Sequence, residues 1–295
     1  VAVETDSGLV GHGITGITQA SPVAEAINKV LGPAVMGLDP LLNERLWHIM
    51  NWTATPWAQS GYASHAISAI DLALWDIKGQ AFGEPVWRLI GGARDSVPVY
   101  ATCGFSFLDD DQLVEAVRRV VAMGFAGIKM QVGRPGRDER KAHPPVEAII
   151  RRDALRIARI REALGPELDI AVDAGVRLDL PSARRLCQLI EPYAVDIVQP
   201  NVIITGGMTQ CLRVAGMAAA FNTLISNGGG APHYNMHLQA GVQNGTAVEW
   251  QFNSATACEV IFPDAPTHED GALAMPQTPG FALIPDADAL KSLAV

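Results

Sequence analysis

The sequence predicts an α/β protein with a parallel sheet, preceded by a smaller α+β region and followed by a tail rich in Pro and Gly. Two patterns predict this class. From residue 97 onward, short apolar segments alternate with helical segments, which is typical of βαβ units. Before residue 97, apolar residues first alternate with polar ones and then recur at helical spacing in 64–82, which indicates a mixed α+β region.

The N-terminal region is predicted to hold mostly short elements. Apolar residues alternate with polar ones around a DSG turn, so residues 1–17 are expected to form two strands. The chain begins inside this meander without a Met or a signal region, and we expect one further strand before Val1. The next expected elements are short helices at 21–31 and 40–50 and an aperiodic, aromatic loop at 48–65.

The helix predicted at 64–82 is the clearest element of the chain. Its apolar face is formed by Ile67, Ile70, Leu74, Ile77 and Ala81. Gly83 follows as the stop signal, and Pro85 lies just beyond it.

The second half predicts six strand–helix units. Strands are expected at 97–103, 126–131, 168–173, 195–199, 222–227 and 247–252. Helices are expected near 110–123, 147–164, 181–191, 206–220 and 232–241. A closed parallel barrel needs eight units. The helix ending at 191 runs almost without a loop into the next strand, so we favour two missing units at Tyr193–Ala194 over an open six-stranded sheet.

Composition excludes several classes of protein. The chain has 295 residues, of which 48% are hydrophobic, and a formal net charge of -9, so it is globular and not disordered. It contains no apolar run of about 18 residues, the length that a membrane helix needs. The acidic balance argues against nucleic-acid or anionic-membrane partners. The cysteines are scattered without a CxxC motif, which indicates neither zinc nor disulfides and favours a reducing, cytoplasmic location.

The carboxyl ends of the predicted strands carry the residues that indicate chemistry, since reactive groups of parallel α/β folds gather there. Lys129 and Gln131 share one face of their strand, and the next strand ends with Asp173. A carboxylate beside an ammonium group suits a divalent cation together with a base or an electrostatic clamp. Asp173 could instead be a capping or salt-bridged residue, and Lys129 could simply extend along apolar neighbours.

Further candidates follow along the chain. Asn201, Asn227 and Glu249 belong to the last three strand segments, although the two amides could also be loop-starting residues. His233 and His237 are four residues apart, but HYNMH lacks the Glu of a HExxH motif, so a substrate-facing or core role is favoured over a metal site. The aromatic loop contributes Trp57 and Tyr62, as a lid over a site or as packing between domains.

Five segments carry a family resemblance. They are SHAISAIDLALWDIKGQAFGEPVWRLIGG at 64–92, GIKMQVG at 127–133, DIAVDA at 169–174, VDIVQPNVIITGGMT at 195–209 and PGFALIPDAD in the tail. Together they closely resemble the mandelate racemase/muconate lactonizing enzyme branch of the enolase superfamily. The resemblance implies a modified (β/α)8 TIM barrel over 96–259 and an α+β capping domain over 1–95, completed by the tail 260–295. On this basis the chain lacks barrel strands 4 and 5 and the first N-terminal strand.

The same resemblance implies a reaction and roles for residues. The family abstracts a proton α to a carboxylate with the help of Mg²⁺. By resemblance, Asp173 is the first metal ligand, Lys129 is the first Lys of a K-x-K segment, and Gln131 stands where the second Lys would be. The two other metal-ligand carboxylates belong to the missing fourth and fifth strands. The resemblance also implies a homo-oligomer.

The later strand ends depart further from the family pattern. Asn201 and Asn227 occupy the positions of an Asp–His dyad, and Glu249 matches an acid that hydrogen-bonds the substrate carboxylate. A racemase needs two bases, which these amides cannot supply, whereas a dehydratase needs one base and one acid.

The hypothesis is therefore a Mg²⁺-dependent lyase that dehydrates an acid sugar. Lys129 would orient or deprotonate the substrate, the two amides would bind hydroxyls, and His233 is a candidate acid. Another isomerase, epimerase or cycloisomerase reaction of the same superfamily is the first alternative. A catalytically retired binding or regulatory protein on the same scaffold is the second.

Overall fold

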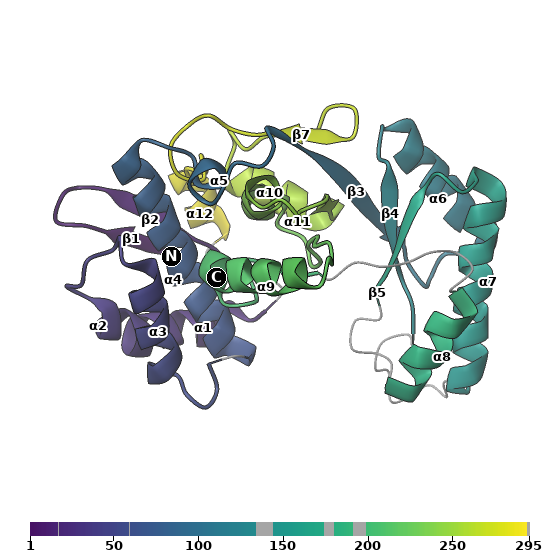
Figure 1. The fold of residues 1–295 in the computed structure, drawn as a ribbon, viewed down its shortest axis with the longest axis horizontal. Helices are drawn as coiled ribbons and strands as arrows, with labels where there is room; N and C mark the ends of the chain where they lie inside the picture. Colours follow the sequence, from purple (N-terminus) through teal and green to yellow (C-terminus); the bar gives the residue numbers. More distant parts are fainter. Residues whose placement is uncertain (17, 59, 134–143, 174–179, 191–198, 294–295) are drawn as a thin grey trace. The chain divides into compact units, whose positions relative to one another are not determined.

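The computed structural model describes residues 1–16, 18–58, 60–133, 144–173, 180–190 and 199–293, and they form two compact units (Figure 1). The first unit comprises Val1–Val97, Val198–His268 and Leu273–Val295. The second comprises Pro98–Ile197 and Glu269–Ala272. The predicted division into a capping domain and a barrel domain at 95/96 stays a prediction.

The first unit opens with an antiparallel hairpin of β1 (Ala2–Glu4) and β2 (Val10–His12), which confirms the two strands predicted in 1–17. This hairpin lies directly against a long helix, α4 (Gly61–Phe82). A Cβ atom on Gly11 would lie 2.1 Å from the carbonyl oxygen of Ala73, so only glycine allows this close approach.

Short helices lie between the hairpin and α4. They are α1 (Ala20–Ala26), the π-helical η1 (Ile27–Leu31), α2 (Gly32–Val35) and α3 (Asn43–Thr53), and α5 (Val86–Leu89) follows α4. The predicted loop at 48–65 was wrong at both of its ends, because α3 continues to Thr53 and α4 begins at Gly61. Leu46 and Met50 are both buried and lie one helical turn apart, so the apolar face of α3 extends into the segment from residue 48 that its polar residues had suggested to be a loop.

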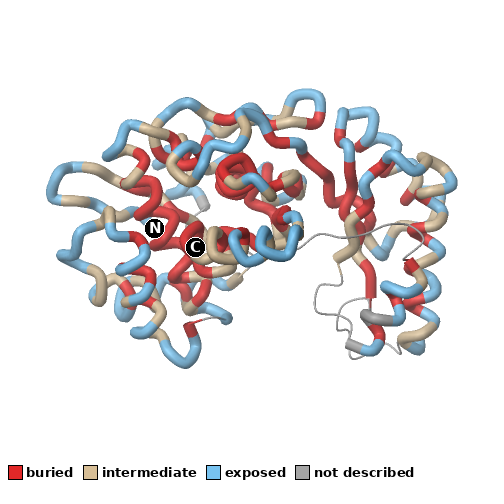
Figure 2. Tube along the Cα trace, in the orientation of Figure 1, coloured by how far each residue is buried: buried red, intermediate tan, exposed pale blue. Residues whose placement is uncertain are grey.

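The long helix α4 is the core of the first unit. Most of its residues between Ser64 and Gly79 are buried, as Figure 2 shows along the same stretch. It ends at Gly83, whose φ of 67° is the left-handed conformation of a glycine C-cap. The helix predicted at 64–82 and its stop signal are therefore confirmed, with a start three residues earlier than predicted.

The C-terminal tail packs on the N-terminal region, where it contacts α4 and α5. Val86 donates its backbone N–H to the Gly280 carbonyl at 2.9 Å. The Asp76 carboxylate of α4 accepts from the backbone N–H of Phe281 at 2.8 Å and from that of His12 at 3.0 Å. Asp76 thus connects the N-terminal hairpin and the tail to one helix.

Replacing Asp76 by Ala is expected to lower the free energy of unfolding by about 2–5 kcal/mol, because two backbone N–H groups lose their acceptor and one of them is buried. Asp76→Asn keeps one oxygen acceptor and should lose clearly less. Urea unfolding measures both values, and limited proteolysis should cut Asp76→Ala first near residue 281. Equal stability of Asp76→Ala and the unmodified protein would contradict this role.

The helix α9 (Gly207–Ala220) also depends on α4. Its first turn has no side-chain cap of its own. Instead, the buried Asp71 carboxylate of α4 accepts from Thr209 through the backbone N–H at 2.9 Å and through the hydroxyl at 2.6 Å. Burial raises the pKa of Asp71 from 3.8 to about 7, against the opposing effect of these hydrogen bonds.

This raised pKa predicts a pH-dependent stability. Between about pH 4 and pH 7 the folded chain holds a proton on Asp71 that the unfolded chain releases, so stability from this group is present at low pH and lost as pH rises through 7. Asp71→Asn cannot titrate. The unfolding free energy of the variant, relative to the unmodified protein, should therefore rise from pH 5 to pH 8, by up to about 1.4 kcal/mol per pH unit. A difference that does not change across this range would contradict the assignment.

The second unit repeats a βα pattern three times. Its elements are β3 (Ser96–Gly104), α6 (Asp110–Ala122), β4 (Gly127–Gln131), α7 (Val146–Leu164), β5 (Asp169–Asp173) and α8 (Leu180–Ile190). β4 pairs in parallel with β3 on one side and with β5 on the other. The three helices lie on one side of these strands (Figure 1). The strands and helices predicted over this stretch, and the α/β class, are confirmed.

In the rest of the first unit the helix predicted at 232–241 is confirmed, whereas the predicted strands agree less well. Its remaining elements are α10 (Pro232–Gly241), β6 (Val248–Trp250), α11 (Phe252–Ile261), β7 (Ala272–Ala274) and α12 (Ala287–Leu293). The strand predicted at 222–227 is reduced to one parallel bridge between Ile225 and Gly245. The strand predicted at 247–252 is shorter, because α11 begins at Phe252. Residues 195–198 of the predicted strand at 195–199 lie outside the described residues. None of the described helices is long and apolar enough to cross a bilayer.

Candidate active site

The carboxyl ends of β4 and β5 bring Lys129 and Asp173 together. The Lys129 ammonium group lies 3.1 Å from Asp173 Oδ2. Lys129 is buried, whereas the Asp173 side chain keeps 36% of its surface exposed. Gln131 is the register partner of Asp173, so all three predicted residues belong to one face of the paired strands. A cation, an amide and a partly accessible carboxylate therefore meet at one strand edge, as the sequence predicted.

A buried ion pair on α7 fixes this edge. Arg156 donates to the Gln131 carbonyl at 3.1 Å and to the Gly104 carbonyl at 3.2 Å, so it joins the ends of β4 and β3. Asp153 lies 3.3 Å from Arg156 and accepts from the Gly133 N–H at 2.7 Å. Burial raises the pKa of Asp153, and the Gly133 N–H and Arg156 oppose this shift. Sequence reasoning missed the pair because nothing in the sequence distinguishes Arg156 from the other Arg residues of α7.

In the first unit, Asn201 and Asn227 are engaged by a neighbouring loop. Asn201 Nδ2 donates to the carbonyls of Gly228 at 2.6 Å and Gly230 at 3.3 Å. Asn227 Nδ2 also donates to the Gly230 carbonyl, at 3.3 Å. Both amides are buried, so they bind the backbone of the loop that follows Asn227. Their predicted contact with substrate hydroxyls stays a prediction.

Glu249 on β6 belongs to the same cluster. It is fully buried, and its Oε2 accepts from the Gly230 N–H at 2.8 Å. Its own backbone N–H donates to Asn227 Oδ1 at 2.9 Å. The predicted residues Asn201, Asn227 and Glu249 are therefore brought together around Gly230.

The two histidines of α10 are core residues in this structure. His233 has no exposed surface, and its Nε2 lies 3.0 Å from the Pro266 carbonyl, to which it donates. Burial lowers the pKa of His233 to about 4 and that of His237 to about 3. The His237 Nδ1 accepts from the backbone N–H of Trp87 at 3.2 Å. A neutral, enclosed His233 is a poor acid near neutral pH, because its remaining N–H proton is bound to the Pro266 carbonyl, and this weighs against its predicted role as the acid.

The aromatic residues of the predicted lid are exposed. Trp57 keeps 74% of its surface accessible and Tyr62 keeps 44%. The Tyr62 hydroxyl donates to Gln19 Oε1 at 3.2 Å. Their contact with a substrate stays a prediction.

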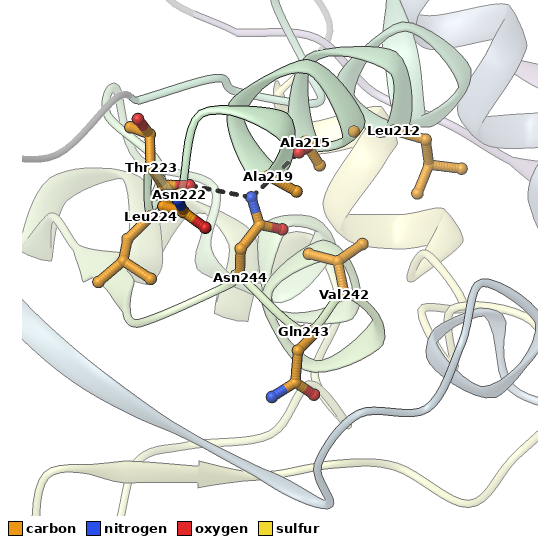
Figure 3. A pocket seen from close by; sticks show the side chains of 10 residues that line it. Leu212, Ala215, Ala219, Asn222, Thr223, Leu224, Val242, Gln243 and Asn244 are labelled. Carbon is orange, nitrogen blue, oxygen red and sulfur yellow. Dashed lines mark hydrogen bonds between the residues drawn. The ribbon is translucent and has the colours of Figure 1, made fainter.

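A pocket of about 590 Å³ lies beside α9 (Figure 3). Asn244 spans it by donating to the carbonyls of Ala215 at 3.0 Å and Thr223 at 3.1 Å. The pocket borders the start of the segment that bridges at Ile225 and ends at Asn227. Because reactive groups gather at the carboxyl ends of such strands, this pocket is at the wrong end to be the active site.

The described residues fit a magnesium ion in part. Asp173 supplies a carboxylate oxygen of the kind that Mg²⁺ prefers, and such sites often use only one or two carboxylates with substrate oxygens and water. In the described part of the chain, no three His, Cys, Asp or Glu side chains are close enough to hold a metal. A site with three such side chains would therefore need residues from outside this part.

Comparisons with known proteins extend these observations. Residues 1–91 match the family model described as mandelate racemase/muconate lactonizing enzyme, N-terminal domain. Residues 112–195 and 188–289 match the model described as enolase C-terminal domain-like.

Two curated relatives and one solved structure are similar along almost the whole chain. A 3,6-anhydro-α-L-galactonate cycloisomerase of Streptomyces coelicolor is 27% identical, over 100% of this chain and 91% of its own. An arabinonate dehydratase of Saccharolobus solfataricus is 28% identical, over 94% of this chain and 85% of its own. The crystal structure of L-talarate dehydratase from Polaromonas, complexed with Mg and L-glucarate, has a TM-score of 0.81 and 25% identity, over 98% of this chain and 90% of its own.

Proposed function

Because the chain belongs to the mandelate racemase/muconate lactonizing enzyme family, we propose that it is a sugar-acid dehydratase. The base removes the proton α to the substrate carboxylate, the β-hydroxyl takes up a proton from the protonated base or from solvent and leaves as water, and the enol that remains becomes a keto acid. The Lys129–Asp173 pair at the ends of two parallel strands is the observation that carries this proposal. The names of the dehydratase relatives support the reaction class.

The mechanism assigns distinct tasks to the residues. Lys129 either takes the α-proton as a base or holds the substrate carboxylate in position while that proton is removed. Asp173 would hold Mg²⁺, and the bound ion would supply positive charge near the carboxylate on which negative charge develops. Glu249 binds the substrate carboxylate, and Trp57 and Tyr62 cover the substrate. Gln131 supplies an amide where a second base would be needed for racemisation, so one-sided proton removal is favoured.

The proposed architecture is a modified (β/α)8 barrel with a capping domain at 1–95 and 260–295, from which barrel strands 4 and 5 are missing at Tyr193–Ala194. Two findings support a gap there. The two matches to the C-terminal family model overlap at 188–195. The alignment with the cycloisomerase is 344 residues long for a chain of 295, so 49 of its positions have no counterpart somewhere along this chain. Two βα units of roughly 30 residues would occupy such a gap.

Sequencing the gene and its transcript across codons 193–194 tests the gap. The expected result is an additional stretch of coding sequence whose two strands each end in a carboxylate. An uninterrupted reading frame without it would favour the alternative of a retired binding protein on the same scaffold, which the internally bonded amides Asn201 and Asn227 also favour.

A screen of acid sugars with Mg²⁺ tests the reaction itself. Dehydration yields a keto acid that is lighter than the substrate by one water, whereas cycloisomerisation or epimerisation leaves the mass unchanged. Mass spectrometry therefore separates the proposal from the cycloisomerase alternative that one relative suggests. Absence of turnover on all acid sugars would remove the enzymatic proposal. The proposed enzyme is a cytoplasmic homo-oligomer with a small carboxylate substrate and no nucleic-acid partner.

A further inference from the structure

We infer that Asn235, on α10, is a positioning residue that holds Glu249 through the backbone of Gly230. The part of this inference that concerns substrate rests on the proposed function. The part that concerns the loop rests on the geometry of the first unit alone.

The loop in question runs in a conformation that needs support. Gly229, Gly230 and Ala231 have φ values of 90°, 75° and 54°. A left-handed φ is strained for Ala231, and such strain persists only where the surroundings over-determine it. Glycine is strongly favoured at position 230, because φ is left-handed there and a Cβ atom would lie 2.2 Å from Ser254 Oγ. Ser254 in turn accepts from the Ala231 N–H at 2.9 Å.

Asn235 is the hub of the groups that support this loop. Its Nδ2 donates to the carbonyls of Gly230 at 3.2 Å and Ala231 at 3.0 Å, and to Asn201 Oδ1 at 3.0 Å. Its Oδ1 accepts from the Val202 N–H at 3.1 Å. The amide orientation is unambiguous, since three acceptors surround the nitrogen and one donor faces the oxygen. The side chain is fully buried, so water cannot replace these bonds.

The connection to Glu249 passes through Gly230. The carbonyl of Gly230 accepts hydrogen bonds from the side-chain amides of Asn201, Asn227 and Asn235, and these bonds hold the carbonyl in place. Its N–H, at the other end, donates to Glu249 Oε2 at 2.8 Å. Loss of the Asn235 amide removes the shortest of these three hydrogen bonds together with the bond to the Ala231 carbonyl, so the Gly230 backbone is held less tightly and its N–H is a weaker donor to Glu249.

Asn244 provides a matched control in the same unit. It is also an Asn whose Nδ2 donates to two backbone carbonyls, those of Ala215 and Thr223. It borders the pocket at the start of segment 222–227, whereas Asn227 and the loop at Gly230 follow at the other end of that segment. Asn244→Ala should therefore cost stability without moving Gly230.

The first arm of the test measures amide hydrogen exchange of Gly230 and Ala231, corrected for global stability by urea unfolding. Asn235→Ala should raise exchange at these two amides at least tenfold while α4 is unchanged, and Asn244→Ala should not raise it. If Asn235→Ala does not fold, Asn235→Ser, which keeps one hydroxyl donor, replaces it. Equal exchange at Gly230 in the Asn235 and Asn244 variants would overturn the inference, because Asn235 would then act on stability alone.

The second arm uses the acid sugar found in the screen. If Glu249 binds the substrate carboxylate equally in the ground and transition states, Asn235→Ala should raise KM about tenfold and leave kcat within about twofold. A fall in kcat with unchanged KM would overturn the link to substrate. Absence of any turnover by the unmodified protein would defeat the proposed function, and the exchange arm would still decide whether Asn235 positions Gly230.

Discussion

Replacing Lys129 by Met is expected to abolish exchange of the substrate α-proton with solvent in D₂O. Lys129 is buried, and its ammonium group pairs with Asp173 at 3.1 Å, so no solvent molecule can easily take its place. A positioned acid or base contributes on the order of 10²–10⁴ in rate, and the loss should be of this size. NMR of the substrate in D₂O, with Mg²⁺ present, measures the exchange directly.

Two further variants separate the possible roles of Lys129. Lys129→Arg keeps the positive charge, but its guanidinium group cannot act as a base. If Lys129 removes the proton, Lys129→Met and Lys129→Arg should both be inactive. If Lys129 only orients the substrate or stabilises the developing charge, Lys129→Arg should retain part of the exchange. Lys78→Met is the control, because Lys78 lies on α4 and donates to the Leu41 carbonyl at 3.3 Å. Unchanged exchange in Lys129→Met would remove Lys129 from the chemistry.

The parts of the fold that could be predicted from sequence are those with a strong local pattern. The helix α4 has an apolar face at helical spacing and a glycine stop, and both ends of the prediction agree with the structure to within three residues. The three βα repeats between β3 and α8 were equally clear. The prediction failed at 222–227, where a short apolar run makes only one bridge, at Ile225. A run of this length cannot distinguish a strand from a buried loop.

Only the site residues that lie at or near the carboxyl ends of strands could be predicted from the sequence. Alternation within β4 placed Lys129 and Gln131 on one face, and the ion pair to Asp173 agrees. The partners that hold the site were missed because they come from helices distant in sequence. Asn235 had a signal, since residues 231–242 contain no charged side chain and are mostly buried, so a polar residue there must bond internally. Arg156 had no such signal among the other basic residues of α7.

Replacing Asp173 by Asn is expected to remove the stabilisation that Mg²⁺ gives to the protein. A ligand at ten times its dissociation constant stabilises the folded state by about 1.4 kcal/mol, which corresponds to a Tm increase of roughly 2–4 °C for a chain of this size. The unmodified protein should show this increase on addition of Mg²⁺, and Asp173→Asn should not, because a neutral amide binds Mg²⁺ far more weakly than a carboxylate.

Asp169→Asn is the matched control for Asp173. Both aspartates lie on β5 and face the same way, four residues apart, but Asp169 opens the strand at its amino end, whereas Asp173 closes it at its carboxyl end and pairs with Lys129. The two substitutions remove the same charge, so a general electrostatic effect of Mg²⁺ would be weakened equally by both. Retention of the Tm increase in Asp169→Asn and its loss in Asp173→Asn would assign the ion to the carboxyl end of β5. A Tm increase that survives in Asp173→Asn would instead mean that the ion binds elsewhere, and Asp173 would then serve only as the ionic partner of Lys129.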